Sequence, residues 1–109
     1  MAYDKNVRIK FKQRRILYDP TKDIKEVTLK KKIKFTKKFV YVDDALDYLK
    51  NELIYTDELK EVREYFKLFE VKDIGCKKKL TYSVTECDTK DGFPYKVITK
   101  YEFRIGEWK

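Results

Sequence analysis

Hydrophobic and basic residues alternate at the start of the chain, in the pattern of a strand with one buried face. Val7, Ile9 and Phe11 take the apolar positions, and Ile16 is apolar in the opposite phase. Because successive side chains of a strand point to opposite sides, a bulge or strand end near Arg14 would account for this shift.

A second strand is expected after a turn at residues 19–23, which contains Pro20. The apolar residues that we assign to its buried face are Val27, Leu29, Ile33 and Phe35. Lys31 falls in the same phase as these residues. We therefore expect either a bulge at this point or a strand that runs past the edge of the core.

The middle third predicts two helices. Asp43 or Asp44 is a good N-cap for the first helix and Thr56 for the second, because their side-chain oxygens can accept hydrogen bonds from the free N–H groups of a first turn. The apolar residues at helical spacing are Leu46, Leu49 and Leu53, then Leu59, Val62, Phe66 and Phe69. One continuous helix is the alternative, but residues 54–57 form a weak helical run with a new cap signal.

The last third predicts a β-hairpin. The even-numbered residues from 80 to 84 and most odd-numbered residues from 95 to 105 are apolar or aromatic, and Asp91-Gly92 marks the turn between them. The expected order is β-β-α-α-β-β. This order predicts an α+β fold, in which a four-stranded antiparallel sheet carries both helices on one face.

The composition fits one folded domain spanning residues 1–109. The chain is 42% hydrophobic and includes nine Tyr and seven Phe, enough for a packed core although 42% of its residues are charged. Residues 1–5 lack the apolar segment of a signal peptide and no stretch is long enough to span a membrane, so we expect a cytoplasmic protein without membrane contact. Cys76 and Cys87 are expected to be free thiols.

Histidine is absent, which removes the commonest general base near neutral pH and the commonest metal ligand. The chain has no glycine-rich phosphate loop, because its three glycines stand alone. We therefore predict no catalytic residue, no bound metal and no cofactor. The weak exception is Glu70-Val71-Lys72, which has the spacing of an acid-x-Lys metal nuclease, with Asp57 or Asp73 as a second Mg²⁺ ligand.

Charge is sorted along the sequence. Residues 1–42 carry a net charge of +10, residues 43–75 of −5 and residues 76–109 of +3. If the strands form as predicted, basic residues gather on the outer face of the sheet, at a spacing suited to successive phosphates. The predicted nucleic-acid-binding residues are Arg8, Lys10, Lys12, Lys30, Lys32, Lys34, Lys96, Lys100 and Arg104. Because the aromatic rings lie mainly on the opposite side, a duplex is favoured over a single strand.

Two other interpretations stay open. Outward lysines also keep strands soluble and prevent edge-to-edge aggregation without binding any ligand. Alternatively, the acidic middle third could dock on the basic groove of a nucleic-acid-handling enzyme, as an inhibitor or accessory factor of the kind that suits a phage or other mobile element. The predicted protein-binding residues are Asp57, Glu61 and Glu64.

The sequence thus favours a small non-enzymatic protein that binds nucleic acid. A protein-binding accessory factor is the alternative, and a small Mg²⁺-dependent nuclease is the third hypothesis. The identity of the partner and the oligomeric state stay open.

Overall fold

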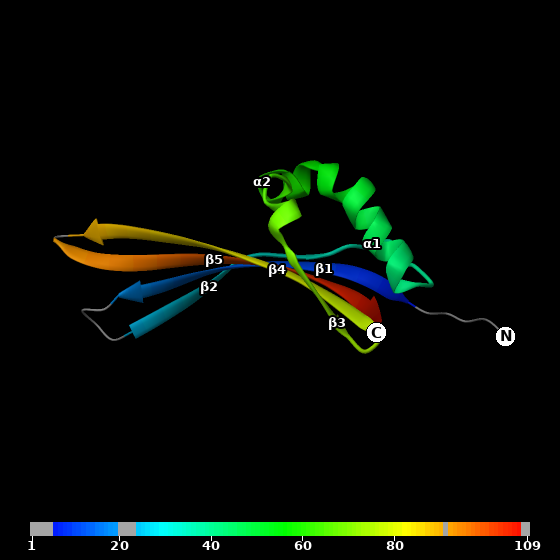
Figure 1. Ribbon diagram of the computed structural model, residues 1–109, viewed down its shortest axis with the longest axis horizontal. Coiled ribbons are helices and arrows are strands. Elements are labelled where there is room, and N and C mark those ends of the chain that lie inside the picture. The colour runs from blue at the N-terminus through cyan, green and yellow to red at the C-terminus, as the bar shows by residue number, and fades with distance from the viewer. Residues whose placement is uncertain (1–5, 20–23, 91, 108–109) are drawn as a thin grey trace.

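A layer of helices covers one end of a long antiparallel sheet in the computed structural model, which describes residues 6–19, 24–90 and 92–107 (Figure 1). The strands are β1 (Val7–Asp19), β2 (Ile24–Lys34), β3 (Glu70–Ile74), β4 (Lys77–Lys90) and β5 (Phe93–Glu107). The helical layer consists of α1 (Val42–Asn51) and α2 (Lys60–Arg63), with the 3₁₀ turns η1 (Leu53–Tyr55), η2 (Asp57–Leu59) and η3 (Phe66–Leu68). The α+β class, the antiparallel sheet and the two helices are therefore confirmed.

The first and last strands pair at the centre of the sheet. The strand order is β2-β1-β5-β4-β3, so the sheet has five strands and the prediction of four is wrong. The missed strand is β3, a short edge strand in which every residue is exposed. Its residues therefore show no alternation between apolar and polar types, which is the signal that reveals a half-buried strand.

The helices begin and end differently from the prediction. Helix α1 begins at Val42, and its N-cap is Tyr41, whose side chain makes no capping hydrogen bond. Asp43 and Asp44 lie inside the first turn instead, where their charge still favours the positive end of the helix. Thr56 precedes η2, but its hydroxyl donates a 2.7 Å hydrogen bond back to the carbonyl of Leu53 and caps nothing.

The second predicted helix is replaced by one turn of α-helix between 3₁₀ turns. Arg63 holds this irregular segment together, because its Nε donates to the carbonyl of Ile54 at 2.8 Å and its Nη2 to that of Thr56 at 3.1 Å. These bonds satisfy carbonyl groups that a regular helix would have paired internally. The apolar stripe still faces the sheet, with Leu59 and Val62 fully buried.

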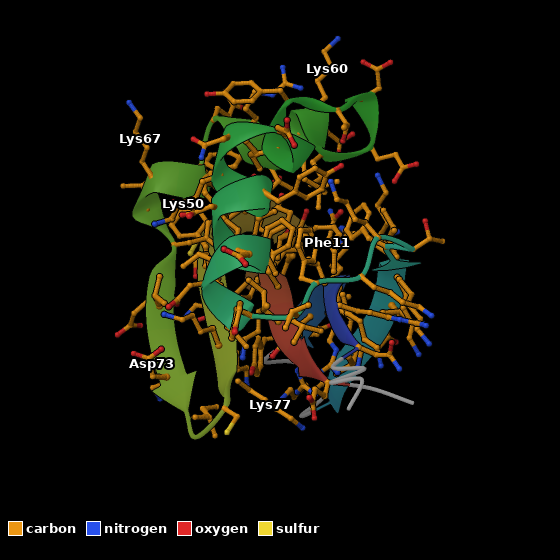
Figure 2. The ribbon with its side chains drawn as sticks, turned by 90° about the vertical axis from the view of Figure 1, so that its right-hand side faces the viewer. Phe11, Lys50, Lys60, Lys67, Asp73 and Lys77 are labelled. Carbon is orange, nitrogen blue, oxygen red and sulfur yellow. The ribbon has the colours of Figure 1, made fainter. Side chains whose placement is uncertain are left out.

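The hydrophobic core lies between the helical layer and the end of the sheet that it covers. Phe11 and Phe103 are neighbours on β1 and β5, with ring centroids 4.7 Å apart, and Leu49 of α1 packs into the same cluster. Figure 2 shows Phe11 near the middle of the molecule, between the helices and the strands. Burial of such large side chains stabilises the fold by about 1.5–3 kcal/mol each.

The four long strands continue beyond the helical layer, and the described residues extend over 64 × 25 × 21 Å (Figure 1). Pairing of β1 with β5 is continuous, so the predicted break in β1 does not occur and Ile16 lies on the face opposite Phe11. Ile16 is buried without belonging to the main core. The register with β2 does shift between Gln13 and Arg14, near the predicted position.

The shift occurs because β2 contains one extra residue. Gln13 pairs with Lys31 and Arg14 with Leu29, which leaves Lys30 out of the register. The bulge predicted near Lys31 is therefore confirmed. Beyond it, Val27 and Leu29 lie on the face opposite Ile33, so the assignment of Val27, Leu29, Ile33 and Phe35 to one buried face is wrong. Phe35 follows the end of β2. Val27 and Leu29 are more than half exposed.

Two sequence-based expectations concern the thiols and the turns. Cys76 and Cys87 are both free, as predicted, and both are exposed. Gly92 has a φ of 81° between β4 and β5, where the hairpin turn was expected, whereas Asp91 and most of the turn at residues 19–23 lie outside the described residues.

Within the described part of the chain, no helix has the length and apolar content needed to cross a membrane.

Gly75 joins β3 to β4 with a φ of 62°, and a Cβ added there would meet no atom within 4 Å. We expect Gly75→Ala to lower the free energy of unfolding by about 1 kcal/mol, because an L-residue is strained in this conformation. Gly75→Asn should cost less, since Asn tolerates it better. Urea denaturation measures the stability of both variants. An Ala variant as stable as the wild type would contradict the positive φ of Gly75.

Candidate functional site

The face of the sheet opposite the helices carries most of the basic residues of the strands. We call it the basic face. Its centre is a line of five cations, one from each strand and each paired in register with the next. This cation row consists of Lys34, Lys10, Arg104, Lys79 and Lys72, in the order β2-β1-β5-β4-β3.

The sheet fixes the spacing of the cation row. Neighbouring strands lie about 4.8 Å apart, so the backbone positions of the five cations span about 19 Å. On their buried side, the flanking residues Phe11, Phe103 and Leu80 belong to the core, which anchors three of the five strands. The row is therefore a line of positive charge on the part of the sheet whose other face is buried in the core.

The next row along the strands contains the one acid near the centre of the basic face. Glu102 pairs with Lys12 on β1 and Thr81 on β4. Its carboxylate lies 3.0 Å from the Nζ of Lys79 and 3.4 Å from the Nε of Arg104. Glu102 thus neutralises part of the cation row.

These contacts decide the protonation of Glu102. Burial works to raise its pKa, but the hydrogen bond from Lys79 and the charges of Arg104 and Lys79 outweigh burial and lower the pKa below the ordinary 4.5. The carboxylate is therefore ionised at neutral pH, and its two ion pairs contribute to the stability of the fold there.

The surroundings of Lys10 disfavour its charged form, whereas those of Glu102 favour its charged form. Partial burial lowers the pKa of Lys10 from 10.5, and the charges of Lys34, Lys32, Arg104 and Lys12 lower it further. The protonated lysine is thus less favourable in the folded protein than in the unfolded chain. The basic face concentrates positive charge at a cost in stability.

Two shallow hollows lie side by side on the basic face. One, of about 290 Å³, is lined by residues of β1, β4 and β5 that include Arg14, Ser83 and Lys100. The other, of about 300 Å³, is lined by residues of β1, β2 and β5, and includes Lys10 and most of its cationic neighbours. Lys12 and Glu102 line both hollows, so the two lie next to each other on the sheet.

Most of the predicted nucleic-acid-binding residues share this face. The register places Arg8, Lys10, Lys12, Lys32, Lys34, Lys96, Lys100 and Arg104 on it. Lys30 is the exception, because the bulge takes it out of the alternation. Lys96 lies at the far end of the strands, away from the cation row, beside Tyr18.

Sequence reasoning missed two members of the cation row. Lys79 precedes Leu80 in the alternating pattern of β4, so the pattern places it on the outer face and could have revealed it. Lys72 belongs to β3, which gives no such signal. Arg14, on the basic face between Lys12 and Ile16, was hidden by the break expected at that point.

The acidic residues predicted to bind a protein lie on the other side of the molecule. Asp57, Glu61 and Glu64 are all exposed and belong to the helical layer, in or beside η2 and α2. The charges of Glu61 and Glu64 reach Tyr101 on the helix side of the sheet and help to raise its pKa, although burial is the larger cause. Their role as a docking surface stays a prediction.

The residues of the predicted nuclease site do not converge. Glu70 and Lys72 share one face of β3, whereas Asp73 lies on the opposite face and binds the Nζ of Lys78 at 3.3 Å. Asp57 belongs to η2 in the helical layer. Within the described ranges, no group of three or more Cys, Asp or Glu side chains is arranged to hold a metal ion.

No protein family model, curated protein or solved structure matches this chain. The candidate site therefore rests on the register of the sheet and on the charges that it brings together.

Glu102→Gln should lower the free energy of unfolding by about 1 kcal/mol at neutral pH, because the variant loses the charge of two ion pairs. The lowered pKa of Glu102 places this contribution above pH 4.5, and it disappears as the pH falls through the folded-state pKa. Thermal unfolding between pH 3 and 7 measures the difference. A constant difference across this range would show that Glu102 stabilises the fold by means other than its charge.

Lys10→Met should stabilise the protein by about 0.5 kcal/mol at neutral pH and low salt, because the substitution removes a positive charge that the neighbouring cations repel. The lowered pKa of Lys10 means that the wild type recovers this difference as the pH rises toward 10.5. Lys60→Met, at an exposed position of α2, is the control and should change little. Equal effects of both substitutions in thermal unfolding would contradict the role of the cation row.

Proposed function

We propose that this protein binds the phosphate backbone of a nucleic-acid duplex through its basic face. The observation that supports this function best is the cation row, which sets five positive charges in register across the whole width of the sheet. A duplex carries one negative charge per about 1.7 Å of its axis, so many phosphates lie within reach of such a surface.

The dimensions of the row suit two phosphate strands at once. At about 19 Å it is longer than the about 12 Å width of the major groove or the about 6 Å width of the minor groove. Its ends can therefore contact phosphates on both sides of one groove. Contacts of this kind fix position and orientation, and carry little information about base sequence.

The surroundings of the row favour a duplex over a single strand. The rings of Phe11, Tyr101 and Phe103 are buried on the helix side, and they cannot stack with bases at the basic face. Proteins that bind single strands usually place such rings among their cations. Tyr18 is the one described aromatic residue that the register places on the basic face, near its far end, with the Nζ of Lys25 5.6 Å from its ring centroid.

Binding of a mixed-sequence duplex should depend steeply on salt. Six phosphate contacts predict a slope of about −5 for log affinity against log salt concentration. Lys10→Ala and Lys32→Ala should each bring the slope about 0.9 closer to zero, whereas Lys60→Ala on the helical layer should leave it unchanged. Fluorescence anisotropy between 50 and 300 mM salt, roughly the range over which such affinities change most, gives the slopes.

Glu102→Gln provides a second readout, because it removes the acid that forms ion pairs with two members of the cation row, Lys79 and Arg104. The variant should bind the duplex more tightly than the wild type although its fold is less stable. The proposal fails if no duplex binds at low salt, or if Lys60→Ala weakens binding as much as Lys10→Ala does.

A further inference from the structure

The outer edge of β3 is a second surface with features of a binding site, separate from the centre of the basic face. β3 pairs with β4, and no described strand pairs with its other edge. All five of its residues are exposed, and the apolar residues Val71 and Ile74 each have about half of their surface accessible to solvent. Alternate backbone N–H and C=O groups of this strand therefore point outward, available to a further strand.

A hollow of about 450 Å³ adjoins this edge on the helix side of the sheet. Its floor is apolar and includes Ile54, Phe66, Phe69 and Leu80, while Val71 of β3 contributes to its wall. The cavity is large enough for one or two apolar side chains, and it lies between the edge strand and helix α1.

The rim of the hollow is cationic. Lys50, Arg63 and Lys67 line it, and no acidic residue does. Arg63 holds its place through the carbonyls of Ile54 and Thr56, whereas Lys50 and Lys67 are exposed and form no ion pair with any other described residue. Figure 2 shows Lys50 and Lys67 on the side of the molecule where β3 lies, and Lys60 farther away.

We propose that the edge of β3 and the adjoining hollow bind an extended acidic peptide segment as a sixth strand. A strand added beside the five residues of β3 would place every second side chain on the helix side, next to Val71 and the hollow. Apolar side chains at these positions would enter the hollow. Carboxylates on the same side of the peptide would meet Lys50 and Lys67.

The charges argue against a second copy of this chain as the occupant. Antiparallel pairing of two β3 edges would put both helical layers on the same side of the joined sheet. The two cationic rims would then face each other across the junction and repel. On the basic face of β3, Glu70 and Lys72 offset each other and add no strong preference.

A fluorescent heptapeptide of sequence DTVTVTE tests the proposal, because it carries its acidic and apolar residues on one side of a strand. We expect saturable binding, with the largest NMR shift changes at the amides of residues 70–74. The double variant Lys50→Glu/Lys67→Glu should bind about tenfold more weakly. The matched control Lys60→Glu should stay within about twofold of the wild type, because Lys60 is an exposed lysine outside the hollow.

Two further peptides test the geometry. N-methylation of either the two valines or the three threonines should abolish binding, and the other set should be tolerated, since only alternate amides face β3. The charge-reversed peptide KTVTVTK should not bind.

The proposal is overturned if both methylated peptides bind, or if Lys60→Glu weakens binding as much as the double variant. It is also overturned if the shift changes map to β1 and β2, or if sedimentation shows a dimer with the β3 amides already protected. Peptide binding by Lys10→Glu, with duplex binding lost, would separate this surface from the proposed nucleic-acid site.

Discussion

The pairing of β1 with β5 is the constraint on which the rest of the molecule depends. These strands come from opposite ends of the chain, and they meet over twelve residue pairs at the centre of the sheet. The same register that puts Phe11 beside Phe103 in the core puts Lys10 beside Arg104 on the basic face. A slip of one residue would bury the cations and expose the rings, so the core fixes the position of the charges.

The helical layer covers only one end of the sheet, and this arrangement separates two kinds of surface. Where the helices lie, the inner face of the sheet is buried in the core, and its outer face can carry a dense row of like charges. Ile16 and Val97 are buried outside the main core cluster, while Val27 and Leu29 stay exposed. The reversal of the apolar phase at Arg14 and the bulge at Lys30 mark the transition between the two regions.

Alternation along the sequence was enough to predict β1, much of β2, β4 and β5, because each has residues buried on one side. It could not reveal β3, whose five residues are all exposed. It also could not give the order of the strands, so the charges were predicted to share a face but not to form a line. The alignment of Lys10 with both Lys34 and Arg104 requires that β1 lie between β2 and β5. Pairings between distant parts of a chain leave no mark in local periodicity.

The cation row bears on whether the basic face serves only to keep the sheet soluble. Lysines that merely prevent aggregation need not be aligned from strand to strand. They destabilise the fold least when they are fully exposed and interleaved with acids. Here partial burial lowers the pKa of Lys10, and the like charges around it lower the pKa further. Glu102 forms its ion pairs with Lys79 and Arg104. A line of phosphates would neutralise the same charges. The repulsion that weakens the free protein would then be relieved in the complex, and the difference would contribute directly to affinity.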